Sequence, residues 1–204
     1  MSKINKITPL TNVKFLNLYE LEAENKFGDT HPYYVASRKD KNTMMAATKK
    51  VIPDGVVIYS LFGEKADKLI MVKQFRYPLN DYTYELPAGL IDPGESVKET
   101  AIREMKEETG LTFTPAKFDD FLSRPHFSSA GMTDETNCTV YGISTGMPNL
   151  DHLEPNEDLS VELVDKNEAK RILREENLSV KAYYLLLHFI QSDPADPFAF
   201  LKLD

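Results

Sequence analysis

The chain has 204 residues, of which 42% are hydrophobic, so it is long enough for one domain with an extension and for a real core. Its 24 Lys and Arg residues against 32 Asp and Glu residues give a formal net charge of −8. This acidity argues against the basic surface on which sequence-independent nucleic-acid binding depends. An anionic small molecule would need local help, from an Arg side chain or from a divalent cation.

Cys138 is the only cysteine, which excludes an intramolecular disulfide and a cysteine-based zinc site within the chain. Residues 1–10 lack the apolar core of a signal peptide, and no apolar run has the length needed to span a bilayer. We therefore expect a cytoplasmic protein with no membrane partner.

Two extended segments come first along the chain. Residues 12–24 and 32–38 are rich in aromatic and β-branched residues, and Gly28 lies in the short stretch between them, which predicts a hairpin. The polar stretch 39–50 then reads as a connecting loop. We expect an N-terminal antiparallel β unit over 1–47 and a second domain over 48–204.

The second domain alternates strand-like and helical patterns. Strands are predicted at 55–62, 68–76, 82–86, about 117–123, 136–144 and 159–164. A helix should begin after Ser96, which has capping-box spacing with Glu99, and should stop at Gly110. Two more helices are expected at 166–175 and from Ser179 to about 191. This order predicts an α/β layered domain.

Three carboxylates lie on the first of these helices. Glu104, Glu107 and Glu108 are spaced i, i+3 and i+4, so they share one side of the helix. One interpretation is a solvated helix end with ordinary ion pairs, such as Arg103 with Glu107. The other is a cluster that a hard divalent cation joins, because carboxylates held together repel one another.

A helical wheel of about 100° per residue separates these interpretations in part. The apolar stripe formed by Val97, Ala101 and Met105 overlaps the positions of Glu104 and Glu108. We therefore expect these two carboxylates at the rim of the core. The loop before the helix, bounded by Gly89 and Gly94, would let backbone approach a ligand closely.

The stretch from Gly89 to Leu111 resembles the Nudix box at every fixed position. These positions are Gly89, Glu95, Arg103, Glu104, Met105, Glu107, Glu108, Gly110 and Leu111. The resemblance implies an α/β/α sandwich with a mixed sheet. It also implies hydrolysis of a nucleoside diphosphate linked to another group, with Mg²⁺ or Mn²⁺ as cofactor.

By the same resemblance, Glu104 and Glu108 are metal ligands, and Glu107 is a ligand or the base for the attacking water. Arg103 and Glu95 would orient the carboxylates. These roles agree with the chemistry, because a metal neutralises diphosphate charge and activates water while the helix fixes the geometry.

Sequences outside the box resemble the ADP-ribose pyrophosphatase branch of the family. The matching segments are VKQFRYP (72–78), ELPAG (85–89), FSSAGMTDE (127–135) and LEPNEDLSVELV (153–164). The implied substrate is ADP-ribose, cleaved to AMP and ribose 5-phosphate. Two alternatives stay open: a broad-range nucleotide-sugar or housecleaning pyrophosphatase, and a non-catalytic nucleotide-sensing module, against which the intact box argues.

The branch resemblance also implies site residues outside the helix. The Ala88 carbonyl would be a backbone metal ligand, Arg76 would bind the diphosphate or ribose, and Leu90 would bind substrate. Contacts to the terminal ribose would come from a second set: Ser129, Gly131 and Glu135. Glu157 would complete the metal site and serve as a candidate base, although Glu154 competes for this role because Pro155 interrupts the acidic run.

A homodimer with exchange of the N-terminal β unit is typical of this branch, and a two-stranded unit needs a packing partner in any case. Aromatic residues of this unit would then stack on the adenine or pack within the unit. The candidates are Phe15, Tyr19, Phe27, Tyr33 and Tyr34.

Overall fold

The computed structural model describes residues 1–203 and divides into two compact units. The first contains Met1–Asp54 together with residues 125–137, and the second contains Gly55–Arg124 with the chain from Cys138 onward. The predicted division into 1–47 and 48–204 stays a prediction. A separate segment of the chain, 125–137, groups with the N-terminal residues.

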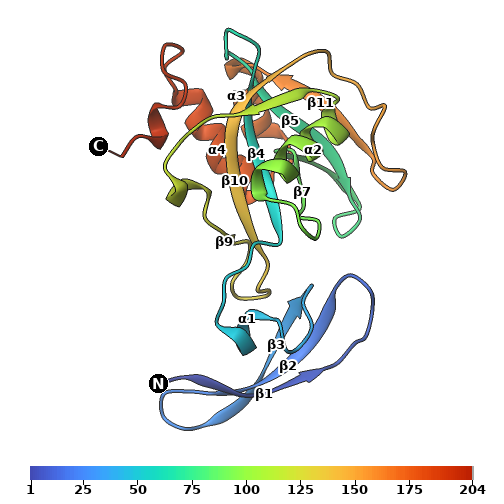
Figure 1. Cartoon of the computed structure of the whole chain (residues 1–204), viewed down its shortest axis with the longest axis vertical. Coiled ribbons are helices and arrows are strands. Elements are labelled where there is room, and N and C mark those ends of the chain that lie inside the picture. Colours follow the sequence, from blue (N-terminus) through green and yellow to red (C-terminus); the bar gives the residue numbers. More distant parts are fainter. Residues whose placement is uncertain (204) are drawn as a thin grey trace. The chain divides into compact units, whose positions relative to one another are not determined.

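The first unit contains a three-stranded antiparallel sheet, labelled β1, β2 and β3 in Figure 1. Its elements are β1 (Lys3–Pro9), β2 (Asn17–Glu24), β3 (Thr30–Ser37), the one-turn helix α1 (Met45–Thr48) and β9 (His126–Phe127). The predicted hairpin is confirmed, with Gly28 at φ +95° in its turn. Strand β1 was not predicted, because its polar sequence KINKITP lacks a clear hydrophobic alternation.

The second unit contains a sheet in the order β11-β5-β4-β10-β8, with β6 paired to β5 and β7 paired to β4. Its strands are β4 (Gly55–Phe62), β5 (Leu69–Arg76), β6 (Asp81–Glu85), β7 (Ala88–Leu90), β8 (Thr112–Pro115), β10 (Thr136–Thr145) and β11 (Leu159–Val164). The first residues of β10 belong to the first unit. Most strand pairs are antiparallel. Strands β4 and β10 instead run in the same direction, because the Gly63 N–H, just after β4, donates to the Ser144 carbonyl at the end of β10. The predicted mixed sheet is confirmed.

Helices cover both faces of this sheet, as Figure 1 shows. They are α2 (Val97–Thr109), α3 (Lys166–Glu175) and α4 (Val180–Gln191), with short 3-10 turns at Asp120–Ser123 and Ala199–Leu201. Successive β4 side chains enter opposite cores: Val56 and Ile58 pack with α2, whereas Val57 and Tyr59 pack with α3 and α4. A strand buried on both faces is the centre of a sandwich. The predicted α/β/α fold is therefore confirmed.

The helix boundaries agree with the capping signals. Ser96 and Glu99 form the predicted capping box of α2, and Gly110 ends the helix at φ +71°. The predicted strand at 117–123 is wrong, because β8 ends at Pro115 and residues 120–123 form a 3-10 turn that begins after Asp119. Acidic residues favour such turns over strands. Among residues 1–203, no helix has both the length and the apolar character needed to cross a bilayer.

Candidate active site

Helix α2 lies against the short strand β7 and contacts each of its residues in turn. The Glu108 Oε2 atom accepts a hydrogen bond of 3.0 Å from the Ala88 N–H. One turn earlier, the Glu104 carboxylate lies so close to Gly89 that a Cβ added there would be 1.9 Å from the Glu104 Cδ atom. The glycine is therefore what lets the strand and this carboxylate meet.

Arg103 completes this junction and joins the acidic side chains around it. Its Nη2 atom donates to the Leu90 carbonyl at 3.0 Å and to Glu95, and its Nε atom also donates to Glu95 at 2.9 Å. Its Nη1 atom donates to both Glu104 and Glu107 at 2.8 Å. The paired Arg103 holds the pKa of Glu95 at about 2, so Glu95 stays ionised. This geometry supports an orienting role for Arg103 and Glu95.

The two candidate ligands on α2 are withdrawn from water. Glu108 is 2% exposed, and the Glu104 side chain is 12% exposed. Burial, with repulsion from the neighbouring carboxylates Glu107 and Glu157, raises the pKa of Glu104 to about 7 against the pull of Arg103. Burial also raises the pKa of Glu108 well above its usual range, with repulsion from Glu104 and Glu157 in addition. The wheel placed both at the rim of the core, and the structure buries Glu108 fully.

Glu157 belongs to the loop between β10 and β11, and it reaches the same electrostatic neighbourhood. It is half-buried, and burial raises its pKa, with repulsion from Glu154 and Glu107 added. Its charge in turn raises the pKa values of Glu104 and Glu108. Glu154 is exposed, and its carbonyl accepts the Glu157 N–H at 3.0 Å. Of the two competing acids, the structure therefore favours Glu157 for the cluster.

The donor chemistry of this cluster suits a hard divalent cation, since buried carboxylate oxygens with raised pKa values need positive charge. In residues 1–203, however, no group of three His, Cys, Asp or Glu side chains is arranged to chelate an ion. The reason is visible in the contacts, because Arg103 holds Glu104 and Glu107, and Glu108 is turned toward Ala88. Metal binding therefore requires these side chains to exchange partners.

Arg76 lies beside the cluster, at the end of β5. Its Nε and Nη2 atoms donate to the two carboxylate oxygens of Glu85, at 2.6 and 3.0 Å. The pKa of Arg76 is raised first by this bond, and also by the charges of Glu108 and Glu157. The sequence reading missed Glu85 as a partner. Its only signal was its place in ELPAG, at the end of β6 and shortly before β7.

The candidate ribose contacts lie in the first unit, where the structure shows their local partners. The Gly131 carbonyl accepts a hydrogen bond of 2.7 Å from the Tyr33 hydroxyl, and Glu135 pairs with Arg38 at 2.9 Å. Ser129 begins a turn through its carbonyl, which accepts the Met132 N–H.

The N-terminal aromatic candidates differ in exposure. Tyr19 is buried and donates its hydroxyl to the Lys39 carbonyl, so it packs within the unit. The other four are exposed over at least two fifths of their surface: Phe15, Phe27, Tyr33 and Tyr34. These four stay candidates for contact with a ligand or a partner chain.

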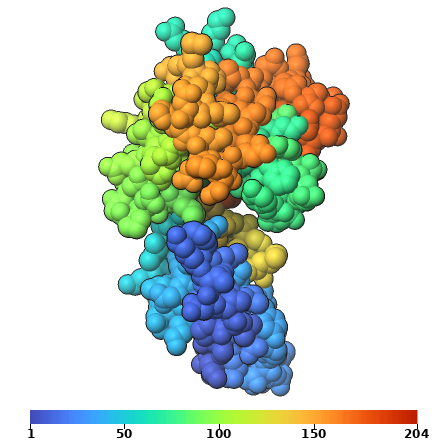
Figure 2. Space-filling view, turned by 90° about the vertical axis from the view of Figure 1, so that its right-hand side faces the viewer, coloured from blue at the N-terminus to red at the C-terminus, as the bar shows by residue number. Residues whose placement is uncertain are grey.

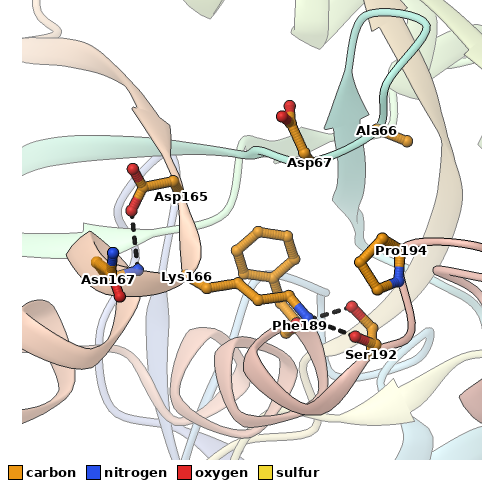
Figure 3. A pocket seen from close by; sticks show the side chains of 8 residues that line it. All are labelled: Ala66, Asp67, Asp165, Lys166, Asn167, Phe189, Ser192 and Pro194. Atoms are coloured by element: carbon orange, nitrogen blue, oxygen red, sulfur yellow. Dashed lines mark hydrogen bonds between the residues drawn. The ribbon is translucent and has the colours of Figure 1, made fainter.

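A separate cavity of about 270 Å³ lies between the loop after β4, the start of α3 and the end of α4 (Figure 3). None of the cluster residues lines it. Two of its polar side chains are already engaged, since Lys166 donates to the Ser192 carbonyl and Asp165 caps α3. The acidic cluster, rather than this cavity, is the candidate active site.

A family model described as the NUDIX domain matches residues 51–186, which is more than half of the chain and includes β7 and α2. The chain belongs to the NUDIX family. The cluster on α2 and β7 is therefore the NUDIX signature as it folds in this chain, and a divalent metal is the general requirement of NUDIX hydrolases.

Known proteins with a NUDIX domain include the putative nudix hydrolase 2 of Caenorhabditis elegans, 36% identical over 64% of this chain and 55% of that protein. The ADP-ribose pyrophosphatase of Saccharomyces cerevisiae is 34% identical over 54% of this chain and 51% of that protein. This NUDIX chain thus spans about half the length of these curated relatives. A crystal structure of an ADP compounds hydrolase matches 93% of this chain and 94% of its own, with a TM-score of 0.63 and 18% identity, which supports the fold.

Proposed function

We propose that this NUDIX protein hydrolyses the diphosphate of ADP-ribose, with Mg²⁺ as cofactor, to AMP and ribose 5-phosphate. The observation that carries the proposal is the buried carboxylate pair Glu104 and Glu108, held against β7 with raised pKa values. The name of the Saccharomyces cerevisiae relative supports ADP-ribose as the substrate.

In this proposal Glu104, Glu108 and the Ala88 carbonyl hold the ion, and Glu157 completes the site. The bound Mg²⁺, or Mn²⁺ in its place, supplies neutralisation of the diphosphate charge and a lowered pKa for bound water. Glu107 serves as a ligand or as the base that takes the proton of the attacking water.

Arg103 and Glu95 keep these carboxylates aligned, because the guanidinium joins four of the groups around it. The bonds of Arg103 to Glu95 and to the Leu90 carbonyl involve none of the residues that would hold the metal, so they can fix the loop before α2 in either state.

The remaining substrate contacts are assigned to residues outside the carboxylate cluster. Arg76 binds the diphosphate, for which its guanidinium must turn from Glu85, and Leu90 contacts the substrate beside β7. The terminal ribose is assigned to Ser129, Gly131 and Glu135. A guanidinium suits this task because its donors match phosphate oxygens in pairs.

The test is product analysis with a panel of nucleotides in Mg²⁺. We expect ADP-ribose to be hydrolysed with a higher kcat/KM than nucleoside triphosphates, with AMP as the nucleotide product. Equal kcat/KM values for many nucleotide sugars would indicate a broad-range pyrophosphatase. Tight ADP-ribose binding without turnover would indicate a sensing module, and a strong preference for dGTP or a dinucleoside polyphosphate would overturn the assignment.

We also propose a homodimer in which the N-terminal β unit is exchanged, in the cytoplasm that the single cysteine favours. Support comes from large apolar side chains exposed along the first unit, including Val13, Phe15, Leu16, Leu18 and Tyr34. Large apolar side chains that are exposed in number are typical of an interface.

Deleting residues 1–45 should therefore abolish both the dimer and the activity. Sedimentation and steady-state kinetics measure the two losses, and circular dichroism verifies that the remaining domain is folded. A folded, monomeric truncation with full activity would contradict the exchange.

A further inference from the structure

The loop that carries Glu157 is tied to the sheet immediately after that residue. The Phe75 N–H donates to the Asp158 carbonyl at 2.8 Å, which extends the β5–β11 ladder by one residue beyond Leu159. The Tyr82 hydroxyl donates to the Asp158 Oδ2 atom, also at 2.8 Å. Asp158 is therefore fixed through both its backbone and its side chain.

These three residues form one row across β6, β5 and the residue just before β11. Tyr82 on β6 is the register partner of Phe75 on β5, and Asp158 pairs with Phe75 from the other side. The Phe75 ring contacts the Tyr82 ring edge to face, with centroids 5.4 Å apart. The Tyr82 side chain therefore reaches over Phe75 to a carboxylate two strands away. Figure 2 shows the orange segment before β11 adjoining the green β5–β6 hairpin.

Glu157 is the first residue beyond this fixed row. Its own N–H turns back to the Glu154 carbonyl, so residues 154–157 form a turn whose far end is set by Asp158. A charge-assisted hydrogen bond at the next residue limits where the Glu157 backbone can move. Small displacements of a catalytic group are costly, so a tie at this place affects the chemistry more than the fold.

We propose that Tyr82 is a positioning residue that acts through Asp158 to hold Glu157 at the acidic cluster. The inference rests on the proposed function, since it takes Glu157 as part of the hydrolytic site. Neither Tyr82 nor Asp158 needs to touch the substrate or the metal for this role.

The chain offers a matched control in Tyr77. Its ring contacts the same Phe75 ring edge to face at 5.4 Å, but its hydroxyl makes no hydrogen bond within residues 1–203. Tyr82→Phe and Tyr77→Phe therefore remove the same atom from neighbouring rings, and only the first breaks the tie to Asp158.

The first readout does not need metal or substrate. Hydrogen exchange of metal-free protein should show faster exchange at the hydrogen-bonded amides of Glu157 and Phe75 in Tyr82→Phe, with Tyr77→Phe like the wild type. Unchanged exchange at these amides in Tyr82→Phe would overturn the proposal.

The second readout is a double-mutant cycle on ADP-ribose hydrolysis. Tyr82→Phe should lower kcat by about fivefold with little change in KM, the scale of one lost hydrogen bond. In a Glu157→Gln background, which itself should lower kcat by ~10²-fold, the Tyr82 change should have no further effect. Full additivity of the two losses, or a raised KM in Tyr82→Phe, would mean that Tyr82 acts on the substrate directly and would overturn the inference.

The failure of the proposed function has a different signature. Wild-type protein that releases no AMP from ADP-ribose, or Glu157→Gln with wild-type kcat, would remove the role of Glu157 itself. The hydrogen-exchange result would still report whether Tyr82 holds the loop.

Discussion

Glu104→Gln and Glu108→Gln should each weaken Mg²⁺ binding and lower kcat together. The expected loss in kcat is ~10²-fold or more, which is the effect of removing a catalytic group. Each substitution keeps size and most hydrogen bonding, including acceptance from the Ala88 N–H by residue 108. It removes the negative charge that a cation needs. Steady-state kinetics over a range of Mg²⁺ concentrations measures both losses. Glu175→Gln, on the exposed face of α3, is the control.

The pH dependence of metal binding gives the same prediction a second test. Mg²⁺ binds the ionised carboxylate, and the pKa of metal-free Glu104 is about 7, so the half-saturating Mg²⁺ concentration should fall as pH rises from 6 to 8. In the Glu104→Gln variant, the half-saturating Mg²⁺ concentration should depend much less on pH. Near-normal rates of both variants at limiting Mg²⁺ would show that α2 is not the metal site.

In the absence of metal, the stability of the folded protein should instead fall as pH rises. Because the folded-state pKa of Glu104 lies above its ordinary value of 4.5, the folded protein binds more protons than the unfolded chain between these values. The contribution of Glu104 to the free energy of unfolding is therefore fully present below the ordinary pKa of its carboxyl group. This contribution is lost as pH rises through about 7. The rise in Tm on adding Mg²⁺ should accordingly be larger at pH 8 than at pH 6.

Gly89→Ala should remove most of the hydrolytic activity while leaving the fold intact. The added Cβ would lie 1.9 Å from the Glu104 Cδ atom, so that carboxylate has to leave its place beside β7. The clash is with the end of a flexible side chain, which can move at small cost to the free energy of unfolding. We expect a loss of ~10²-fold in kcat/KM, since a displaced ligand acts like a missing one, with a Tm near that of the wild type.

Gly142→Ala is the matched comparison, since it places a Cβ 2.3 Å from the Thr114 carbonyl oxygen and 2.6 Å from the Phe113 ring. Backbone of the paired strand β8 cannot yield as a side chain can, so this variant should lose stability by about 1–3 kcal/mol. Thermal unfolding and kinetics of both variants separate the effects. Equal losses of Tm in the two variants would contradict the account of Gly89.

Several features could be predicted because they depend on residues close in the sequence. The boundaries of α2 follow from Ser96, Glu99 and Gly110, and the α/β order follows from hydrophobic periodicity. The wheel also predicted that Glu104 and Glu108 lie on the core side of α2, since an α-helix has a fixed number of residues per turn, but it placed Glu108 at the rim of the core, where the structure buries it fully. The strand at 117–123 was wrong because local turn preference prevailed over a short apolar pattern.

The sequence by itself determined the family signature, the layered fold and the shared side of the three carboxylates on α2. Only the tertiary structure decided that Glu108 is fully buried, that Glu157 is half-buried whereas Glu154 is exposed, and that Arg76 is paired with Glu85. It also decided that Tyr82 holds Asp158. The physical reason is that burial and charge pairing depend on which distant segments meet, and local spacing carries no information about side chains brought together across strands.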